Sequence, residues 1–63
     1  MNKLKEKREA VGMSQSDLAE ASGVSVRMVQ HYEQEFKDIN RAAVSTVKKL
    51  ADALGCKIEE LVD

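Results

Sequence analysis

The segment from residue 14 to residue 33, SQSDLAEASGVSVRMVQHYE, predicts two short helices joined by a tight turn. Ser14, followed three positions later by Asp17, matches the capping-box pattern of a helix start. Gly23 supplies the left-handed backbone conformation with which the chain leaves one helix, and Ser25 is then placed to cap the next. Two helices of this size are a common device for placing one helix in the major groove of DNA.

The rest of the chain predicts a single all-α domain, residues 1–63. The length of 63 residues lies near the lower limit for folding without disulfides or metals, and one Cys with one His argues against both. The absence of Pro and the abundance of Ala, Leu, Lys and Glu favour helices. No apolar run is long enough for a membrane span or a signal peptide, so we expect a cytoplasmic protein without membrane contact.

Apolar spacing and turn residues predict helices over about 2–11, 15–21, 26–34, 41–54 and 57–62, which makes a compact five-helix domain. The strongest periodic signal lies in the fourth helix, where the expected inward positions are Val44, Val47, Leu50, Ala51 and Leu54. Asn40 is expected to cap this helix. In the first helix, Leu4, Arg8 and Val11 share one face. The Arg8 guanidinium is either paired with a carboxylate from elsewhere in the domain or simply solvated.

The outward side of the helix over 26–34 carries the candidate base-reading residues. Val29 and Tyr32 take its inward positions, which leaves outside Val26, Arg27, Gln30 and His31. These side chains suit base edges, because Arg bridges guanine acceptors, Val packs on the thymine methyl group, and Gln and His donate hydrogen bonds. The alternative for His31 is an ordinary exposed histidine. The candidate phosphate contacts are Ser14, Gln15, Ser25 and Lys37.

Apolar residues outside the periodic core are candidates for a dimer interface. Phe36 lies in the connection over 33–40 and is either a core plug or an exposed residue available to a partner. In the last helix, the apolar edge consists of Ile58, Leu61 and Val62. Cys56 is expected to pack as a small hydrophobe.

The charge balance limits the strength of DNA binding. Ten Lys and Arg oppose eleven Asp and Glu, which gives a net charge of −1, and no basic stripe is visible. Phosphate affinity should therefore be modest and sensitive to salt.

Taken together, these residues resemble the phage repressor and Cro type of helix-turn-helix domain, a family of XRE-like transcriptional regulators. The resemblance rests on Arg8, Ser14-Gln15-x-x-Leu18-Ala19, Gly23-Val24-Ser25, Val29, Tyr32-Glu33, Leu50-Ala51-x-x-Leu54-Gly55 and Ile58-Glu59-Glu60-Leu61. It implies a small repressor that binds double-stranded DNA sequence-specifically, as a homodimer on a palindromic operator with its third helix in the major groove.

The resemblance also assigns roles to individual residues. It implies that Gln15 contacts a phosphate and that Val26, Arg27 and His31 read bases, with Gln30 as a flanking candidate. It further implies that Glu33 pairs with Arg8 in a structural ion pair.

Two positions depart from the family pattern. Glu35 stands where the family usually has Gly, so either the third helix continues or Glu35 takes a positive φ angle at some cost. Ala42 and Ala43 stand where the family often has Pro and a capping Ser, which moves the expected start of the fourth helix back to Asn40.

The alternative to a regulator is a protein-interaction or antitoxin-like module that keeps the fold with weak or no DNA binding. The acidic balance of the chain and the acidic, partly apolar patch formed by Glu35, Phe36 and Asp38 favour this alternative. An enzyme is not expected, because no phosphate loop, paired buried carboxylates or nucleophile–base arrangement can be built. We expect no cofactor, metal or small-molecule substrate. Regulation would then depend on concentration, dimerisation or a regulatory protein partner.

Overall fold

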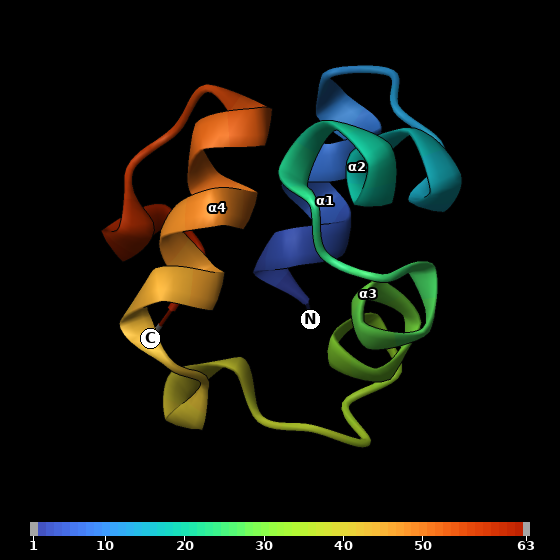
Figure 1. Cartoon of the computed structure of the whole chain (residues 1–63). Helices are drawn as coiled ribbons and strands as arrows, with labels where there is room; N and C mark the ends of the chain where they lie inside the picture. Colours follow the sequence, from blue (N-terminus) through green and yellow to red (C-terminus); the bar gives the residue numbers. More distant parts are fainter. Residues whose placement is uncertain (1, 63) are drawn as a thin grey trace.

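The computed structural model describes residues 2–62, and within that range it contains four α-helices and two 3-10 turns. The α-helices are α1 (Lys3–Ala10), α2 (Gln15–Ser22), α3 (Val26–Glu33) and α4 (Val44–Leu54), and the turns are η1 (Ile39–Arg41) and η2 (Ile58–Glu60). Figure 1 shows α4 opposite α1, α2 and α3, with the connection from α3 to α4 crossing between the two sides along one edge. The all-α class predicted from the sequence is confirmed over these residues.

The core forms where α2 packs against both α3 and α4. Its fully buried centre contains Leu18 from α2, Val29 from α3 and Leu50 from α4, each with no exposed surface. Burial of one such side chain contributes about 1.5–3 kcal/mol, so three of them form the main apolar attachment between these helices. Leu4 attaches α1 to the same core.

The prediction of a fifth helix over 57–62 is wrong, because this segment forms only the 3-10 turn η2. Its backbone bonds run from Glu60 N–H to the Lys57 carbonyl and from Leu61 N–H to the Ile58 carbonyl. A segment this short gains too few bonds to offset the entropy of starting an α-helix. Leu61 is 1 % exposed and belongs to the core, so it drops out of the candidate dimer interface. Ile58 and Val62 are partly buried against the same core.

An ion pair holds η2 against α1. Lys7 Nζ lies 2.9 Å from Glu60 Oε1, and the Glu60 carboxylate also accepts the Lys57 backbone N–H at 2.8 Å. The pKa of Glu60 is lowered mainly by the hydrogen bond from the Lys57 N–H and next by the Lys7 ammonium. The hydrogen bond to Glu60 in turn raises the pKa of Lys7. Beside this pair, Cys56 is a half-buried free thiol that packs on the core, and burial raises its pKa.

The predicted start of α4 is wrong by three residues. Asp38 accepts the Asn40 backbone N–H on its side chain at 2.9 Å and so begins the separate turn η1. Ala42 then takes an extended conformation, with φ −69° and ψ 154°, which interrupts any continuous helix from residue 41. α4 starts at Val44 with Ala43 in the N-cap position, where no side chain accepts a hydrogen bond. Asn40 therefore does not cap α4.

Three apolar residues are more exposed than a core position allows. The sequence predicts Val44 inside, but this residue is the first of α4 and is 72 % exposed. The sequence also predicts Val11 on the inner face of α1, but Val11 follows the end of that helix and is 49 % exposed. Phe36 is 75 % exposed, which decides between the two alternatives for this residue.

The end of α3 decides the alternative at Glu35, which takes a φ angle of +62°. α3 stops at Glu33, and Gln34 is its C-cap. Phe36 N–H donates to the His31 carbonyl at 2.9 Å and Glu35 N–H donates to the Tyr32 carbonyl at 3.3 Å. These two bonds form a Schellman motif, in which glycine is the usual residue at the position of Glu35.

Candidate nucleic-acid interface

α2 begins with a reciprocal pair of hydrogen bonds between Ser14 and Asp17. The Asp17 N–H donates to Ser14 Oγ and the Ser14 N–H donates to the Asp17 carboxylate, both at 3.0 Å. The pKa of Asp17 is lowered mainly by the hydrogen bond from the Ser14 N–H and next by the Ser14 hydroxyl. The capping box predicted from the sequence is present, and it fixes the end of α2 that carries Gln15.

The turn between α2 and α3 satisfies its own backbone groups. Gly23 takes a φ angle of +76° and donates its N–H to the Ala19 carbonyl at 2.9 Å. Ser22 Oγ accepts the Val24 N–H at 3.2 Å, and Ser25 Oγ accepts the Met28 N–H at 3.2 Å, which caps α3. Since Val24 is itself buried, the turn fixes the angle at which α3 leaves α2.

The candidate base-reading residues lie on the outer side of α3 as predicted from its periodicity. Val26 is 39 % exposed and Arg27 is exposed, whereas Gln30 and His31 are half-buried. Among residues 2–62, Arg27 makes no hydrogen bond or ion pair, so its guanidinium donors are free. Val29 and Tyr32 face inward, at 0 % and 6 % exposure. The first turn of α3 therefore presents an apolar surface beside a free bidentate donor.

An ion pair with little solvent contact attaches α3 to α1. Arg8 Nε donates to Glu33 Oε2 at 2.7 Å and Arg8 Nη2 donates to Glu33 Oε1 at 3.0 Å. The side chains are 11 % and 3 % exposed, and Arg8 Nη1 donates to the Met13 carbonyl at 2.8 Å. The hydrogen bonds to Glu33 raise the already high pKa of Arg8, so the guanidinium stays charged. The second of the two alternatives for Arg8, a solvated surface charge, is excluded.

Gln15 and Gln30 extend this ion pair towards the outer side of α3. Gln15 Nε2 donates to Glu33 Oε1 at 3.1 Å, and Gln30 Nε2 donates to Gln15 Oε1 at 3.3 Å. The sequence marks both glutamines as separate DNA contacts but gives no sign that they are bonded to each other. The spacing on α3 puts Gln30 and Glu33, three residues apart, on one face, but the position of Gln15 between them depends on how α2 packs against α3.

The other end of the outer face carries an aromatic contact. The rings of His31 and Phe36 have centroids 6.0 Å apart and planes at 76°, an edge-to-face arrangement. This is the side-chain contact that accompanies the Schellman motif at the end of α3. Phe36 is thus exposed to solvent but lies against His31, and it limits the conformations open to that imidazole.

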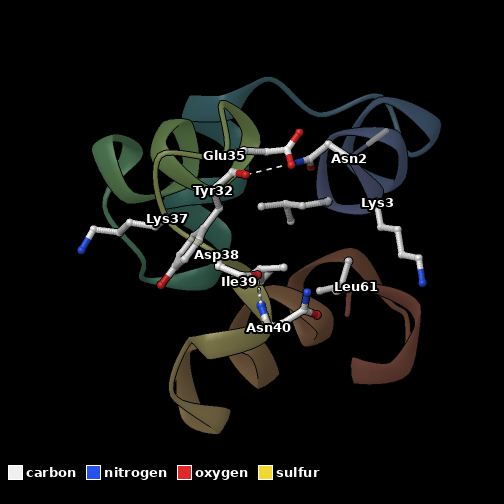
Figure 2. Close-up of a pocket in the computed structure, with 10 residues that line it drawn as sticks. Asn2, Lys3, Tyr32, Glu35, Lys37, Asp38, Ile39, Asn40 and Leu61 are labelled. Carbon is white, nitrogen blue, oxygen red and sulfur yellow. Dashed lines mark hydrogen bonds between the residues drawn. The ribbon is translucent and has the colours of Figure 1, made fainter. Parts of the chain in front are cut away.

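Asn2 connects the ends of two helices, a role that the sequence pattern does not predict. Its Oδ1 accepts the Lys5 N–H at 2.9 Å, which caps α1. Its Nδ2 donates to the Tyr32 carbonyl at 2.8 Å and to the Glu33 carbonyl at 3.3 Å, which satisfies the last turn of α3. Figure 2 shows the bond to Tyr32 at the rim of a pocket that Ile39 also lines. Lys37 points away from this pocket into solvent.

The described residues offer no second kind of site. No group of three or more His, Cys, Asp or Glu side chains in residues 2–62 lies close enough to hold a metal ion. Over the same residues, none of the helices combines the length and the apolar character that crossing a membrane requires.

Comparison with known proteins assigns the family. A family model described as helix-turn-helix matches residues 4–61, nearly the whole chain. A solved structure, the restriction-modification controller protein C.AhdI from Aeromonas hydrophila, is 34 % identical with a TM-score of 0.84, covering 94 % of this chain and 85 % of that one. No match was found among curated proteins. The chain belongs to the XRE-type helix-turn-helix family and is a DNA-binding transcriptional regulator by class.

Proposed function

We propose that this chain acts as a homodimeric repressor in the cytoplasm and binds a roughly palindromic operator. The α3 helices of the two copies enter successive major grooves about 34 Å apart. The observation that carries this proposal is the first turn of α3, where the exposed Arg27 has free donors beside the exposed Val26. The Ser25 cap and the Arg8–Glu33 pair hold that turn in a fixed direction.

The residues along α3 have separate roles in base readout. Arg27 donates to the O6 and N7 atoms of a guanine, the commonest specific contact between a side chain and a base. Val26 packs on a thymine methyl group next to it. Gln30 and His31 lie further along the same face and contact the neighbouring base pairs.

The phosphate contacts are sequence-independent and flank α3. The Ser25 hydroxyl accepts the Met28 N–H, which leaves its own proton to donate to a phosphate oxygen. The Ser14 hydroxyl accepts the Asp17 N–H and also interacts with the Asp17 carboxylate, so its proton turns from Asp17 to the phosphate when DNA binds. Gln15 has a second amide proton besides the one bonded to Glu33. Lys37 adds a solvent-facing charge after α3. With a net charge of −1, affinity depends on these few contacts and falls steeply with salt.

The dimer surface is proposed to include the apolar side chains that the core leaves partly or fully open, which are Phe36, Ile58 and Val62. They lie on the connection after α3 and around η2, so none of them belongs to the first turn of α3. Self-association through them would leave both copies of Arg27 free to meet DNA.

The test is selection of binding sites from a random duplex pool, followed by affinity measurements on the selected site. Arg27→Ala should weaken binding to that site by about 1–3 kcal/mol and flatten the preference at one base pair. Arg41→Ala is the matched control, because Arg41 is also exposed but lies in η1, paired loosely with Asp38 at 3.9 Å. An equal, uniform loss in both variants would contradict the assignment of Arg27 as a base reader.

A low-salt binding assay with random duplex separates this function from the alternative. Non-specific phosphate contact appears first as salt is lowered, so a DNA-binding regulator gives a retarded band there. Absence of any retardation would favour the protein-interaction module, with the 75 % exposed Phe36 as its contact.

A further inference from the structure

We propose that Gln15 is a positioning residue that fixes the amide of Gln30, so that Gln30 turns its carbonyl oxygen towards the base edges. Gln30 then selects a base that carries an amino group, adenine or cytosine, at one position of the operator. This inference rests on the proposed DNA-binding function and specifies the base chemistry that one residue of α3 recognises.

The argument begins at the buried end of the hydrogen-bond chain, where the polarity is fixed by charge. A guanidinium has only donors and an ionised carboxylate has only acceptors. Arg8 occupies both oxygens of Glu33, with N–O distances of 2.7 and 3.0 Å. Any further group that bonds to Glu33 must therefore donate a proton to it.

This requirement fixes the orientation of the Gln15 amide. Its Nε2 atom lies 3.1 Å from Glu33 Oε1. A flipped amide would place the Gln15 oxygen against a carboxylate that is 3 % exposed, where repulsion is poorly screened by water. Gln15 must therefore keep its nitrogen towards Glu33 and its Oε1 towards α3.

The same reasoning passes the polarity on to Gln30. Since Gln15 Oε1 can only accept a hydrogen bond, Gln30 must donate an N–H to it. The Gln30 Nε2 atom lies 3.3 Å from Gln15 Oε1. One amide proton of Gln30 is thereby used. Among residues 2–62 no donor reaches Gln30 Oε1, so this acceptor remains available on the outer side of α3.

An acceptor at this place distinguishes the bases of the major groove. Adenine N6 and cytosine N4 are amino donors there, whereas thymine O4 and guanine O6 are acceptors. A free glutamine rotates its amide to suit either kind of base, but in a glutamine held by Gln15 the positions of Oε1 and of the one remaining Nε2 proton are fixed. Its Oε1 accepts from an amino group and opposes thymine O4 or guanine O6, and the remaining proton matches the N7 acceptor that adenine places beside its amino group. Because Gln15 holds its amide, Gln30 distinguishes bases that a freely rotating glutamine would bind equally well.

The experiment measures base preference at every operator position by selection from a random duplex pool, for the original chain and three variants. Gln15→Met keeps the length of the side chain but removes both of its hydrogen bonds. Gln30→Lys replaces the acceptor with donors only. Gln34→Met is the matched control, because Gln34 is an exposed glutamine just beyond the end of α3 and outside the hydrogen-bond chain. Thermal melting of each variant checks that it is folded.

The base pair read by Gln30 is the one whose preference changes in Gln30→Lys. There the original chain should favour adenine or cytosine by about tenfold, and Gln30→Lys should reverse the preference towards guanine or thymine. Gln15→Met should reduce the preference to less than about threefold while leaving the pair read by Arg27 unchanged. Gln34→Met should leave the preference at the Gln30 pair as it is.

The outcomes separate this inference from the proposed function. If the original chain binds DNA but prefers guanine or thymine at this pair, or if Gln15→Met leaves the preference intact, the inference is overturned and the proposed function stands. The inference is overturned in the same way if Gln30→Lys changes no position. If the original chain binds no duplex at low salt, both fail.

Discussion

Two adjacent segments of this chain, residues 14–33 and residues 34–43, differ in how well their residues suit the local backbone conformation. In residues 14–33, each helix start has a serine cap and the single left-handed residue is Gly23. In residues 34–43, the left-handed residue is Glu35, and Ala43, the N-cap of the following helix, offers no side-chain cap. The first segment satisfies its helix starts with side chains, whereas the second contains a residue under backbone strain and a helix start whose first N–H groups have no side-chain acceptor.

This difference shows where the fold depends on precise local chemistry. The direction of α3 relative to α2 decides what the outer face can read, and the residues that set this direction are those best suited to their conformations. The connection to α4 only has to bring Leu50 and Leu54 back to the core, which the apolar face of α4 achieves by itself. Less suitable residues are tolerated where packing supplies the constraint.

The largest expected effect comes from breaking the ion pair that supports the first segment. Arg8→Ala leaves the Glu33 carboxylate buried without its counter-charge and should lower the free energy of unfolding by about 3 kcal/mol. Urea denaturation measures this loss. Lys48→Ala, which removes an exposed pair with Asp52 on α4, is the control and should cost less than about 0.5 kcal/mol. Equal losses in the two variants would show that the Arg8 pair does not hold α3.

The second segment can be improved by restoring a cap. Ala43 is exposed and has φ −59° and ψ 140°, the extended conformation that an N-cap residue adopts. In Ala43→Ser the new hydroxyl can accept the Ser45 N–H or share the Thr46 N–H, which donates to the Ala43 carbonyl at 3.0 Å, and unfolding should cost about 1 kcal/mol more. Ala53→Ser, within α4, is the control and should bring no gain. A stabilised Ala53→Ser with an unchanged Ala43→Ser would contradict the assignment of this cap.

A smaller gain is expected from relieving the backbone at Glu35. In Glu35→Gly the positive φ angle no longer costs energy, although glycine gains entropy in the unfolded chain, and a net stabilisation of about 0.5–1 kcal/mol is expected. Glu35→Ala separates strain from charge, because alanine keeps the side-chain penalty while removing the carboxylate. Should Glu35→Ala stabilise as much as Glu35→Gly, the gain would come from charge and not from the backbone.

The smallest effect concerns the pH dependence of the α2 cap. Because Ser14 lowers the pKa of Asp17 in the folded protein, the stability from this bond is present above the ordinary Asp pKa and is lost as pH falls through the folded value. The melting temperature of Asp17→Asn should therefore lie below that of the original chain at pH 7, and the difference should shrink below about pH 4. A difference independent of pH would mean that the carboxylate charge plays no part in the cap.

The sequence predicts the helix bounds well in residues 14–33 and less well after residue 34. Ser14, Gly23 and Ser25 act on their immediate neighbours, so the bounds of α2 and α3 follow from local pattern to within a residue. The start of α4 is missed because Asp38 and Asn40 both suit a cap, and Asp38 takes that role for a different turn. The length of the last element depends on how Leu61 packs, which local pattern does not contain.

The candidate interface shows the corresponding limit for side chains. Periodicity places Arg27, Gln30 and His31 on the outer face of α3 because that face depends on one helix alone. The bond between Gln15 and Gln30 depends on the angle between two helices and on Glu33, which α1 holds from a third direction. Such contacts depend on tertiary packing, so the spacing of residues within one helix does not predict them.

The double role of Asn2 has a consequence for how this domain can be re-engineered. Together with Arg8 it fastens α3 to α1 through the backbone of the last turn and the Glu33 side chain, in bonds that involve no residue of the connection over 36–42. The rest of the support for α3 comes from packing against the core, which α4 provides wherever the connection lets it dock. A peptide inserted between residues 36 and 42, such as an epitope or a sensor peptide, adds an entropic cost of loop closure that grows only slowly with its length. We expect such an insertion to leave the orientation of α3 unchanged.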